Sequence, residues 1–263
     1  MSQPLRGLCV VIPRAEGRGE SLAARLRELG AEPMLYPVIA YAPPEDLAPL
    51  QTAVQRLMQQ DFDWLVLTSV TAVQAVRDRI AESCNQRRDP IPRSLSTKIA
   101  VVGPATAQAC AKLLKQTPAT MPAVFSAQAL ASVMGDVRGQ RVLLLNADIA
   151  QPTLQQALQQ TGAQVARVIA YRTVRAENTE IDLPALLRSN AVHAVLFTSG
   201  STVRYFLERV GPALFDAIRK LRIECIGPST AAAVQALGLR PAAVAAAATE
   251  DGLIEALMAA FNN

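Results

Sequence analysis

Most side chains of this chain that could bind a ligand are hydroxyls placed directly after short apolar segments. Thr68 and Ser69, for example, follow the segment Trp64-Leu-Val-Leu67. A single hydroxyl at such a position most often caps a helix. Recurrence at matching places in both halves of the chain favours a shared role in binding a ligand with many carboxylates. The complete set is Thr68, Ser69, Thr106, Ser126, Thr198, Ser199, Ser201, Thr202, Ser229 and Thr230.

Two stretches in different halves of the chain are nearly identical. One reads Gly103-Pro104-Ala105-Thr106-Ala107 and the other reads Gly227-Pro228-Ser229-Thr230-Ala231. Each follows an apolar segment, which predicts a strand, a glycine turn and a helix whose first residue is proline. We expect the two residues after each proline to direct backbone N–H groups and hydroxyls outward, as at helix starts that bind anions.

The side chains on which most catalytic sites depend are scarce. His193 is the only histidine and precedes an apolar segment, which favours a structural role over catalysis. Without a second histidine or a cysteine cluster, a transition-metal site is not expected. The motifs of dinucleotide binding, of P-loop nucleotide binding and of serine hydrolases are missing, so no cofactor is expected. Tyr171 adds a phenol, beside Arg172, in a segment expected to border the ligand.

Composition and charge exclude several classes of protein. The chain has 263 residues, 51% of them apolar and 4% aromatic, a balance that favours helices covering a sheet. Its net charge of +4 is carried by dispersed basic residues, so a nucleic-acid partner is not expected. No apolar run approaches the ~18 residues of a membrane span and no export signal is seen, so we expect a cytoplasmic protein. Cys9, Cys84, Cys110 and Cys225 form no Cys-x-x-Cys pair and are expected to be reduced thiols, with Cys84 in a polar loop.

The second half of the chain repeats the pattern of the first. Gly139-Gln-Arg-Val-Leu-Leu-Leu145 corresponds to the apolar segment at residues 10–12, and Ala194-Val-Leu-Phe197 corresponds to Trp64-Leu-Val-Leu67. A repeat of about 130 residues in which strands alternate with helices indicates an internal duplication. The predicted fold is therefore α/β, with two similar doubly wound parallel-sheet lobes. Ligands bind such sheets at the carboxyl ends of their strands, so the hydroxyl-bearing turns are expected to line one cleft between the lobes.

The segments between these motifs complete the expected organisation. Apolar residues at helical spacing predict helices at about residues 47–58 and 72–80. Residues 34–44 are punctuated by prolines, which predicts a crossing strand or linker. The polar residues 82–96 are expected to form the most mobile loop.

Together these motifs resemble the uroporphyrinogen-III synthase family over nearly the whole chain. The resemblance includes the Thr-Ser turns and both Gly-Pro-x-Thr-Ala stretches. It also includes Val168-Ile-Ala-Tyr171-Arg172 and Thr249-Glu-Asp-Gly252-Leu253. It implies that residues 1–36 and 173–263 form one discontinuous lobe and that residues 37–172 form the other. Two linkers, near residues 36–43 and 167–174, are then expected to pair as a two-stranded ladder.

The resemblance also implies an activity. The family cyclises hydroxymethylbilane to uroporphyrinogen III, with inversion of ring D and loss of water, and it uses no cofactor. The substrate carries an acetate and a propionate on each of four pyrroles, and backbone amides and hydroxyls hold it. Such an enzyme works mainly by holding a folded geometry and by stabilising an azafulvenium cation. A monomer with a small-molecule partner, and with neither a nucleic acid nor a membrane, is expected.

The resemblance assigns roles to particular residues. Tyr171 is the candidate catalytic residue, because it is placed to assist the departing hydroxyl. The candidate substrate-binding residues are Arg14, Thr68, Ser69, Gly103, Ala105, Thr106, Ser126, Thr198, Ser199, Ser201, Thr202, Gly227, Ser229 and Thr230.

One turn departs from the family's pattern. Where the family often has two arginines, this chain reads Asn146-Ala147-Asp148-Ile149-Ala150-Gln151. Charge-assisted hydrogen bonds are the stronger ones, so the loss disfavours binding of a polycarboxylate. An alternative is therefore a catalytically impaired relative that acts as a bilobed tetrapyrrole or polycarboxylate binding protein. A sensing module of the periplasmic-binding type is a third reading, against which the missing export signal and effector domain argue.

Overall fold

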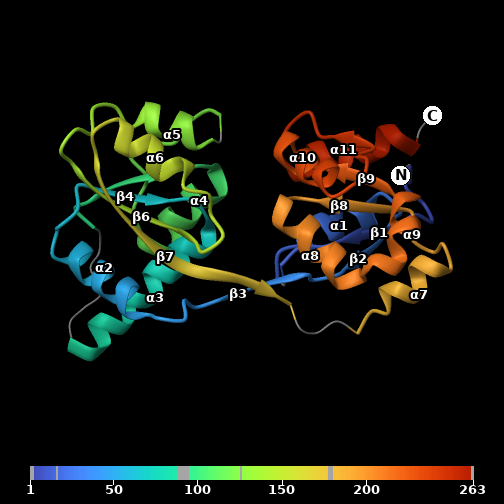
Figure 1. Ribbon diagram of the computed structural model, residues 1–263, viewed down its shortest axis with the longest axis horizontal. Helices are drawn as coiled ribbons and strands as arrows, with labels where there is room; N and C mark the ends of the chain where they lie inside the picture. The colour runs from blue at the N-terminus through green and yellow to red at the C-terminus, as the bar shows by residue number, and fades with distance from the viewer. Residues whose placement is uncertain (1–2, 16, 88–94, 125, 177–179, 262–263) are drawn as a thin grey trace. The chain divides into compact units, whose positions relative to one another are not determined.

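The computed structural model describes residues 3–15, 17–87, 95–124, 126–176 and 180–261, which form two compact units. Unit 1 combines Met1–Ala40 with Val174–Asn263, and unit 2 is Tyr41–Thr173. The chain therefore passes from one unit to the other twice (Figure 1).

Unit 1 is built on a five-stranded sheet. Its strands are β1 (Cys9–Ile12), β2 (Glu32–Leu35), β8 (Ala194–Phe197), β9 (Arg222–Cys225) and β10 (Ala243–Val244). They lie in the order β10-β9-β8-β1-β2, and every pair is parallel. Its helices are α1 (Glu20–Glu28), α7 (Leu183–Arg188), α8 (Gly200–Val210), η2 (Pro212–Leu214), α9 (Phe215–Arg219), α10 (Pro228–Ala236) and α11 (Glu250–Phe261).

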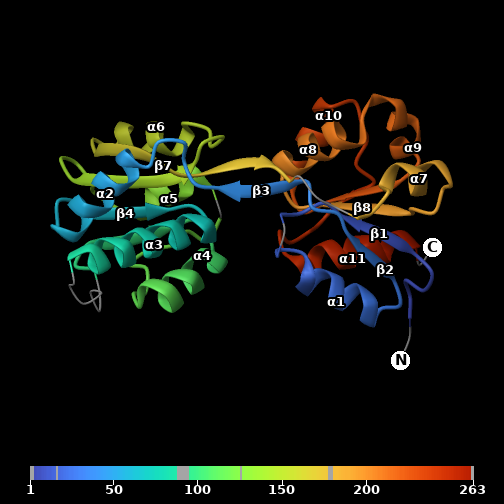
Figure 2. The same cartoon turned by 90° about the horizontal axis from the view of Figure 1, so that it is seen from below.

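Helices cover both faces of this sheet, as the apolar strands require. The four residues of β8 are all buried, which is typical of a parallel strand packed on its two sides. Leu26 of α1 and Leu257 of α11 belong to the core on one face. Phe206 of α8 and Val234 of α10 belong to the core on the other. Figure 2 shows these layers in an edge-on view.

Unit 2 is built on a second five-stranded sheet. Its strands are β3 (Ile39–Ala42), β4 (Trp64–Leu67), β5 (Lys98–Val101), β6 (Arg141–Ala147) and β7 (Gln164–Arg175), in the order β3-β7-β6-β4-β5. Every pair whose register the structure describes is parallel. One face carries α2 (Ala48–Met58), α3 (Val70–Arg87), α4 (Pro104–Ala109) and the π-helical turn η1 (Cys110–Leu114). The other face carries α5 (Ala127–Val133) and α6 (Thr153–Gln160).

The two passages between the units are strands rather than free linkers. β3 and β7 are neighbours in one sheet, and both run across a unit boundary. The first boundary between the units follows Ala40, inside the expected linker near residues 36–43, and Val38 and Ile39 are buried in the core of unit 1. Thr173 belongs to unit 2, because its N–H donates to Asp148 Oδ1 at 3.0 Å.

Helix α3 is longer than its sequence pattern predicts. It continues to Arg87, so the first part of the expected loop at residues 82–96 is helical. Cys84 is buried within the same core as Val76 and Ile80, at helical spacing, and it does not lie in a loop. Because the residues around Cys84 are polar, the sequence pattern does not indicate that the helix continues to Arg87. Residues 88–94, where the rest of that loop was expected, lie outside the described residues.

One carboxylate is buried in the core of unit 1. Glu224 lies in the middle of β9 and has no exposed surface. One of its carboxylate oxygens contacts Arg222 Nε at 3.4 Å, while the other has no partner among the described residues. Burial raises the pKa of Glu224, and the attraction of Arg222 only partly offsets this.

We expect replacement of Glu224 by glutamine to stabilise unit 1 at neutral pH. A carboxyl whose folded-state pKa is raised holds its proton more tightly in the folded protein, so stability falls as pH rises from about 4.5 through the raised pKa. Glutamine removes this loss, and it changes little where the carboxyl is already neutral. Thermal unfolding at pH values below and above this window measures the difference. Glu255→Gln, at an exposed position of α11, is the control. Parallel stability profiles for E224Q and the parent chain would contradict the expectation.

Candidate active site

The hydroxyl-bearing turns of unit 1 follow the carboxyl ends of β8 and β9. Because these strands are parallel, their ends lie at the same edge of the sheet. Ser199 caps α8, since its Oγ accepts from Thr202 N at 3.3 Å and lies 3.0 Å from Ser201 Oγ. The Thr202 hydroxyl is buried and donates to Ser199 O at 2.7 Å, so it closes the turn. Thr198, Ser199 and Ser201 are half-buried, which leaves them within reach of a ligand.

The two Gly-Pro stretches form the strand, turn and helix that the sequence predicts. Gly103 and Gly227 precede α4 and α10 with extended backbones. Ala105 and Ser229 are exposed at the second position of each helix. Thr106 and Thr230 are buried, which corrects the expectation that their hydroxyls face outward. They are the third residues of their helices, where the side chain turns back toward the sheet.

Arg14 lies after the carboxyl end of β1 and forms an ion pair with Glu250. Glu250 is the first residue of α11, and Thr249 caps this helix by accepting from Gly252 N at 3.1 Å. The sequence alone indicated only helix capping for the acidic pair Glu250-Asp251. The structure adds that Glu250 offsets the charge of Arg14, so this cation is already partnered.

The hydroxyl-bearing turns of unit 2 also cap helices. Ser69 follows β4 and accepts from Ala72 N in the first turn of α3 at 3.1 Å. Ser126 caps α5 by accepting from Ala129 N at 3.2 Å. Both serines and Thr68 are half-buried. Each of these hydroxyls still has acceptor or donor capacity beyond its cap, because a hydroxyl offers two lone pairs and one hydrogen.

Tyr171 is oriented by a β-bulge in β7. The parallel register with β6 shifts between Asn146 and Ala147, so that Ile169 pairs with Asn146 and Tyr171 pairs with Ala147. A bulge changes the direction in which the next side chain points. Tyr171 therefore joins its chain neighbour Ala170 in the core on the α2 and α3 face, although alternation would place the two on opposite faces.

A pocket of about 260 Å³ lies beside the Tyr171 side chain. Thr71, Gln74 and Asp78 line it from α3, and Tyr41 lines it from β3. The rings of Tyr41 and Tyr171 pack edge to face with centroids 5.2 Å apart. Tyr171 is 9% exposed, and its ring lies at the pocket wall against the Tyr41 ring and the core of unit 2. Within unit 2 this arrangement brings Tyr171 close to the helix that Ser69 caps.

The turn that lacks arginines of its own receives one from the next strand. Arg167 of β7 donates through Nη2 to Ala150 O at 2.8 Å and through Nε to Asn146 Oδ1 at 3.3 Å. Asp148 is held in the same turn, since its N–H donates to Tyr171 O at 3.1 Å. The sequence did not single out Arg167, because its distance from the turn depends on the pairing of β6 with β7.

The remaining reactive side chains lie away from these edges or are inactive as nucleophiles. His193 Nδ1 accepts from Cys9 N at 3.0 Å at the amino ends of β8 and β1, so this side chain joins two strands at the edge opposite the hydroxyl-bearing turns. Burial raises the pKa of the Cys110 thiol to about 12. Burial and Glu224 raise that of Cys225 to about 11, so both remain thiols. The described residues contain no cluster of histidine, cysteine and acidic side chains able to hold a metal ion.

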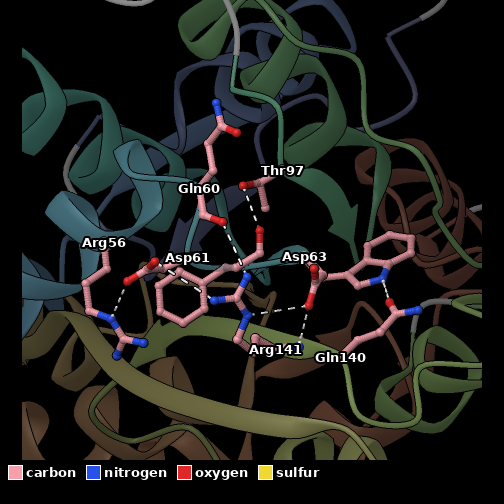
Figure 3. Close-up of polar contacts among 9 residues, drawn as sticks. Arg56, Gln60, Asp61, Asp63, Thr97, Gln140 and Arg141 are labelled. Atoms are coloured by element: carbon pink, nitrogen blue, oxygen red, sulfur yellow. Dashed lines mark hydrogen bonds and ion pairs between the residues drawn. The ribbon is translucent and has the colours of Figure 1, made fainter.

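The opposite, amino edge of the unit 2 sheet carries a polar network with a structural role (Figure 3). Arg141 N donates to Asp63 Oδ2 at 2.7 Å. Trp64 Nε1 donates to Gln140 Oε1 at 2.6 Å. Thr97 Oγ1 donates to Phe62 O at 3.0 Å. These hydrogen bonds join the segments where β4, β5 and β6 begin, so the polar groups of these side chains find their partners within the network.

Within each unit, the structure gathers the predicted residues at one edge of the sheet. In unit 1 these residues are Arg14, Thr198, Ser199, Ser201, Thr202, Gly227, Ser229 and Thr230. In unit 2 they are Thr68, Ser69, Gly103, Ala105, Thr106, Ser126 and Tyr171. Parallel sheets with hydroxyl-bearing turns at their carboxyl edges place the chain among α/β proteins that bind ligands where strands end. No described helix has the length and apolar character needed to cross a membrane.

Comparison with known proteins identifies the family. Residues 20–255 match the family model described as "Uroporphyrinogen-III synthase HemD". The chain is 32% identical over 260 residues to the uroporphyrinogen-III synthase of Synechococcus elongatus, and the alignment covers 97% of this chain and 96% of that protein. The chain therefore belongs to the uroporphyrinogen-III synthase family, whose members are cyclising lyases of tetrapyrrole synthesis.

Solved structures share the fold. A mutant uroporphyrinogen III synthase from the extremely thermophilic bacterium Thermus thermophilus matches with a TM-score of 0.66 and 21% identity, over 97% of this chain and 99% of that one. Uroporphyrinogen-III synthetase from Helicobacter pylori 26695 matches with a TM-score of 0.58 and 16% identity, over 96% and 99%. At these identities the likeness concerns the α/β fold with its parallel sheets.

Proposed function

We propose that this protein cyclises hydroxymethylbilane to uroporphyrinogen III, with inversion of ring D and loss of water. The observation that carries the proposal is the family match, which extends over residues 20–255 and is accompanied by 32% identity to a relative of nearly equal extent. The hydroxyl-bearing turns at the strand ends support it, because they suit a substrate with many carboxylates.

Tyr171 is the proposed catalytic residue. Its phenol donates a proton to the terminal hydroxyl of the substrate, and the C–O bond breaks to release water and leave an azafulvenium cation. The substituted α-carbon of ring D attacks the cation to give a spiro intermediate. The bond from this carbon to its original bridging methylene then breaks, which forms a second azafulvenium cation, and the free α-carbon of ring D attacks that methylene so that the ring is inverted. Final ring closure releases a proton, which restores the phenol. The support is the position of Tyr171, held at the wall of the 260 Å³ pocket by the bulge in β7.

The substrate-binding role falls mainly on the accessible members of the predicted set. Thr68, Thr198 and Ser201 are half-buried hydroxyls at strand ends, and Ala105 and Ser229 are exposed at helix starts. Thr106, Thr202 and Thr230 are buried, so in this proposal they support the turns rather than contact the substrate. The enzyme needs no strong acid or base elsewhere, since its task is to hold the bilane folded.

The proposal also covers the internal duplication of the chain, its location in the cell and its oligomeric state. An internal duplication is supported by the strand orders, since β2-β1-β8-β9 of unit 1 corresponds to β7-β6-β4-β5 of unit 2. In each series all neighbouring strands are parallel, and helices lie on both faces of the sheet. The proposal also includes a cytoplasmic monomer that acts without a cofactor, as the family resemblance and the four cysteines, expected to be reduced, imply.

The direct test is incubation of the protein with freshly prepared hydroxymethylbilane, followed by separation of the uroporphyrinogen isomers. The type III isomer is expected, in excess of what a protein-free sample forms. Type I product alone, at the spontaneous rate, would reject the activity. Tight binding of uroporphyrinogen without type III product would instead support the alternative of a catalytically impaired binding protein.

A further inference from the structure

We propose that Arg167 forms a carboxylate-binding subsite for the substrate in unit 2, a proposal that rests on the proposed function. Arg167 lines a pocket of about 500 Å³ with Asp148, Val168, Ile169 and Arg172 of the same unit. The apolar side chains suit one side of a pyrrole ring, and the guanidinium suits the acid group that the ring carries.

The guanidinium of Arg167 is held in place by neutral groups. Nη2 and Nε donate to Ala150 O and Asn146 Oδ1, as described above. Asn146 is only 2% exposed, so its amide oxygen is a fixed acceptor. These two bonds orient the arginine fork and leave its charge without a counter-ion. A planar guanidinium held in this way is preorganised for a bidentate bond to a carboxylate.

Among the described residues that line this pocket, one other cation is paired with a carboxylate, and two carboxylates are held by backbone N–H groups, which orient them but leave their negative charge in place. Arg172 pairs with Glu45 at 2.6 Å. Asp46 accepts from Ala48 N at 2.9 Å. Asp148 accepts from Thr173 N at 3.0 Å. Among the described residues no carboxylate lies within 4.0 Å of the Arg167 guanidinium. Arg167 is therefore the cation of this pocket whose charge an entering acid group can offset.

A second arginine also has neutral hydrogen-bond partners, but its surroundings differ from those of Arg167. Arg209 of unit 1 donates to Pro37 O at 2.9 Å and to Ala176 O at 2.7 Å. It lies over the Tyr36 ring, 5.0 Å from the centroid. Its bonds join chain segments of the core, whereas those of Arg167 hold a cation at a pocket wall. The combination of anchored charge and adjoining pocket carries the inference.

The experiment compares Arg167→Gln, Arg167→Lys and the parent protein with hydroxymethylbilane as substrate. We expect R167Q to raise KM about tenfold and to change kcat by less than about threefold, because a charge-assisted bond made equally in ground and transition states is lost. R167K should recover part of the loss. The rise of KM with salt should be weaker in R167Q than in the parent protein.

Arg141→Gln is the matched control. It removes one positive charge from the same sheet but at the opposite edge, within the network of Figure 3. If R167Q and R141Q have the same KM, the subsite is rejected. A fall in kcat and in the unfolding midpoint of R167Q, without a change in KM, would show a structural role and also reject it.

A binding titration separates this proposal from the proposed function. Uroporphyrin, which carries the same eight acid groups as the product, is titrated into the parent protein and R167Q without any turnover. Weaker binding to R167Q by about tenfold supports the subsite even if the parent protein forms only type I product. Equal binding to both proteins overturns it, as does the absence of binding to either.

Discussion

Replacing Tyr171 with phenylalanine is expected to lower kcat by about 100-fold, because a positioned proton donor contributes about 10² to 10⁴ in rate. Phenylalanine keeps the edge-to-face contact with Tyr41 and the packing beneath α2 and α3. Binding of uroporphyrinogen III should therefore change by less than about threefold. Single-turnover kinetics with hydroxymethylbilane and a product-binding titration measure the two quantities.

Tyr41→Phe is the control for this prediction. The Tyr41 ring lies against Tyr171 at the same pocket, and it is 40% exposed. Loss of its hydroxyl preserves the ring contact and removes a phenol to which no role is assigned. Turnover close to that of the parent protein is expected for Y41F. Equal losses of turnover and product binding in Y171F would show that Tyr171 holds the substrate rather than assists its chemistry.

Replacing Gly252 with alanine is expected to lower the free energy of unfolding of unit 1 by about 2 kcal/mol, which is typical of a side chain forced into a packed site. A Cβ at this position would lie far inside van der Waals contact with the backbone oxygen of Ala247. Thr249 N donates to the same oxygen at 2.8 Å, so the segment cannot move without loosening the cap of α11. Denaturant titration measures the change.

The same substitution is expected to disturb the ion pair between Glu250 and Arg14 at the carboxyl edge of the unit 1 sheet. Glu250 lies in the turn that must move, and it is the ion-pair partner of Arg14.

Gly227→Ala serves as a control for the stability of G252A, because the φ of Gly227 is −174° and a Cβ there meets no atom within 4 Å. A change of less than about 0.5 kcal/mol is expected for G227A. An unchanged unfolding midpoint for G252A would mean that the chain near Ala247 shifts without cost.

The sheets could be predicted from sequence because parallel strands are buried on both faces. Trp64-Leu-Val-Leu67 is apolar throughout, and the structure places it as the four-residue strand β4. The Gly-Pro stretches were equally informative, since proline is suited to the first position of a helix. The predicted α/β class with parallel sheets is confirmed for this reason.

The details of the site depended on register, which sequence patterns do not contain. Alternation along β7 predicts neither the bulge that turns Tyr171 toward α3 nor the reach of Arg167 into the turn after β6. Residues 146–151 contain no arginine or lysine, so the sequence predicts a turn without a positive charge. In the structure, a residue of the neighbouring strand places a guanidinium there.

The discontinuity of unit 1 imposes an order on folding. Unit 2 is one continuous segment, so its sheet can form as soon as that segment has been synthesised. β1 is an inner strand of unit 1, and its partner β8 lies far along the chain. The hydrogen bond from Cys9 N to His193 Nδ1 joins residues 184 positions apart. β1 can pair with β2 at once, but its pairing with β8 must wait until residues 194–197 have been synthesised, which makes the assembly of unit 1 a non-local and comparatively slow step.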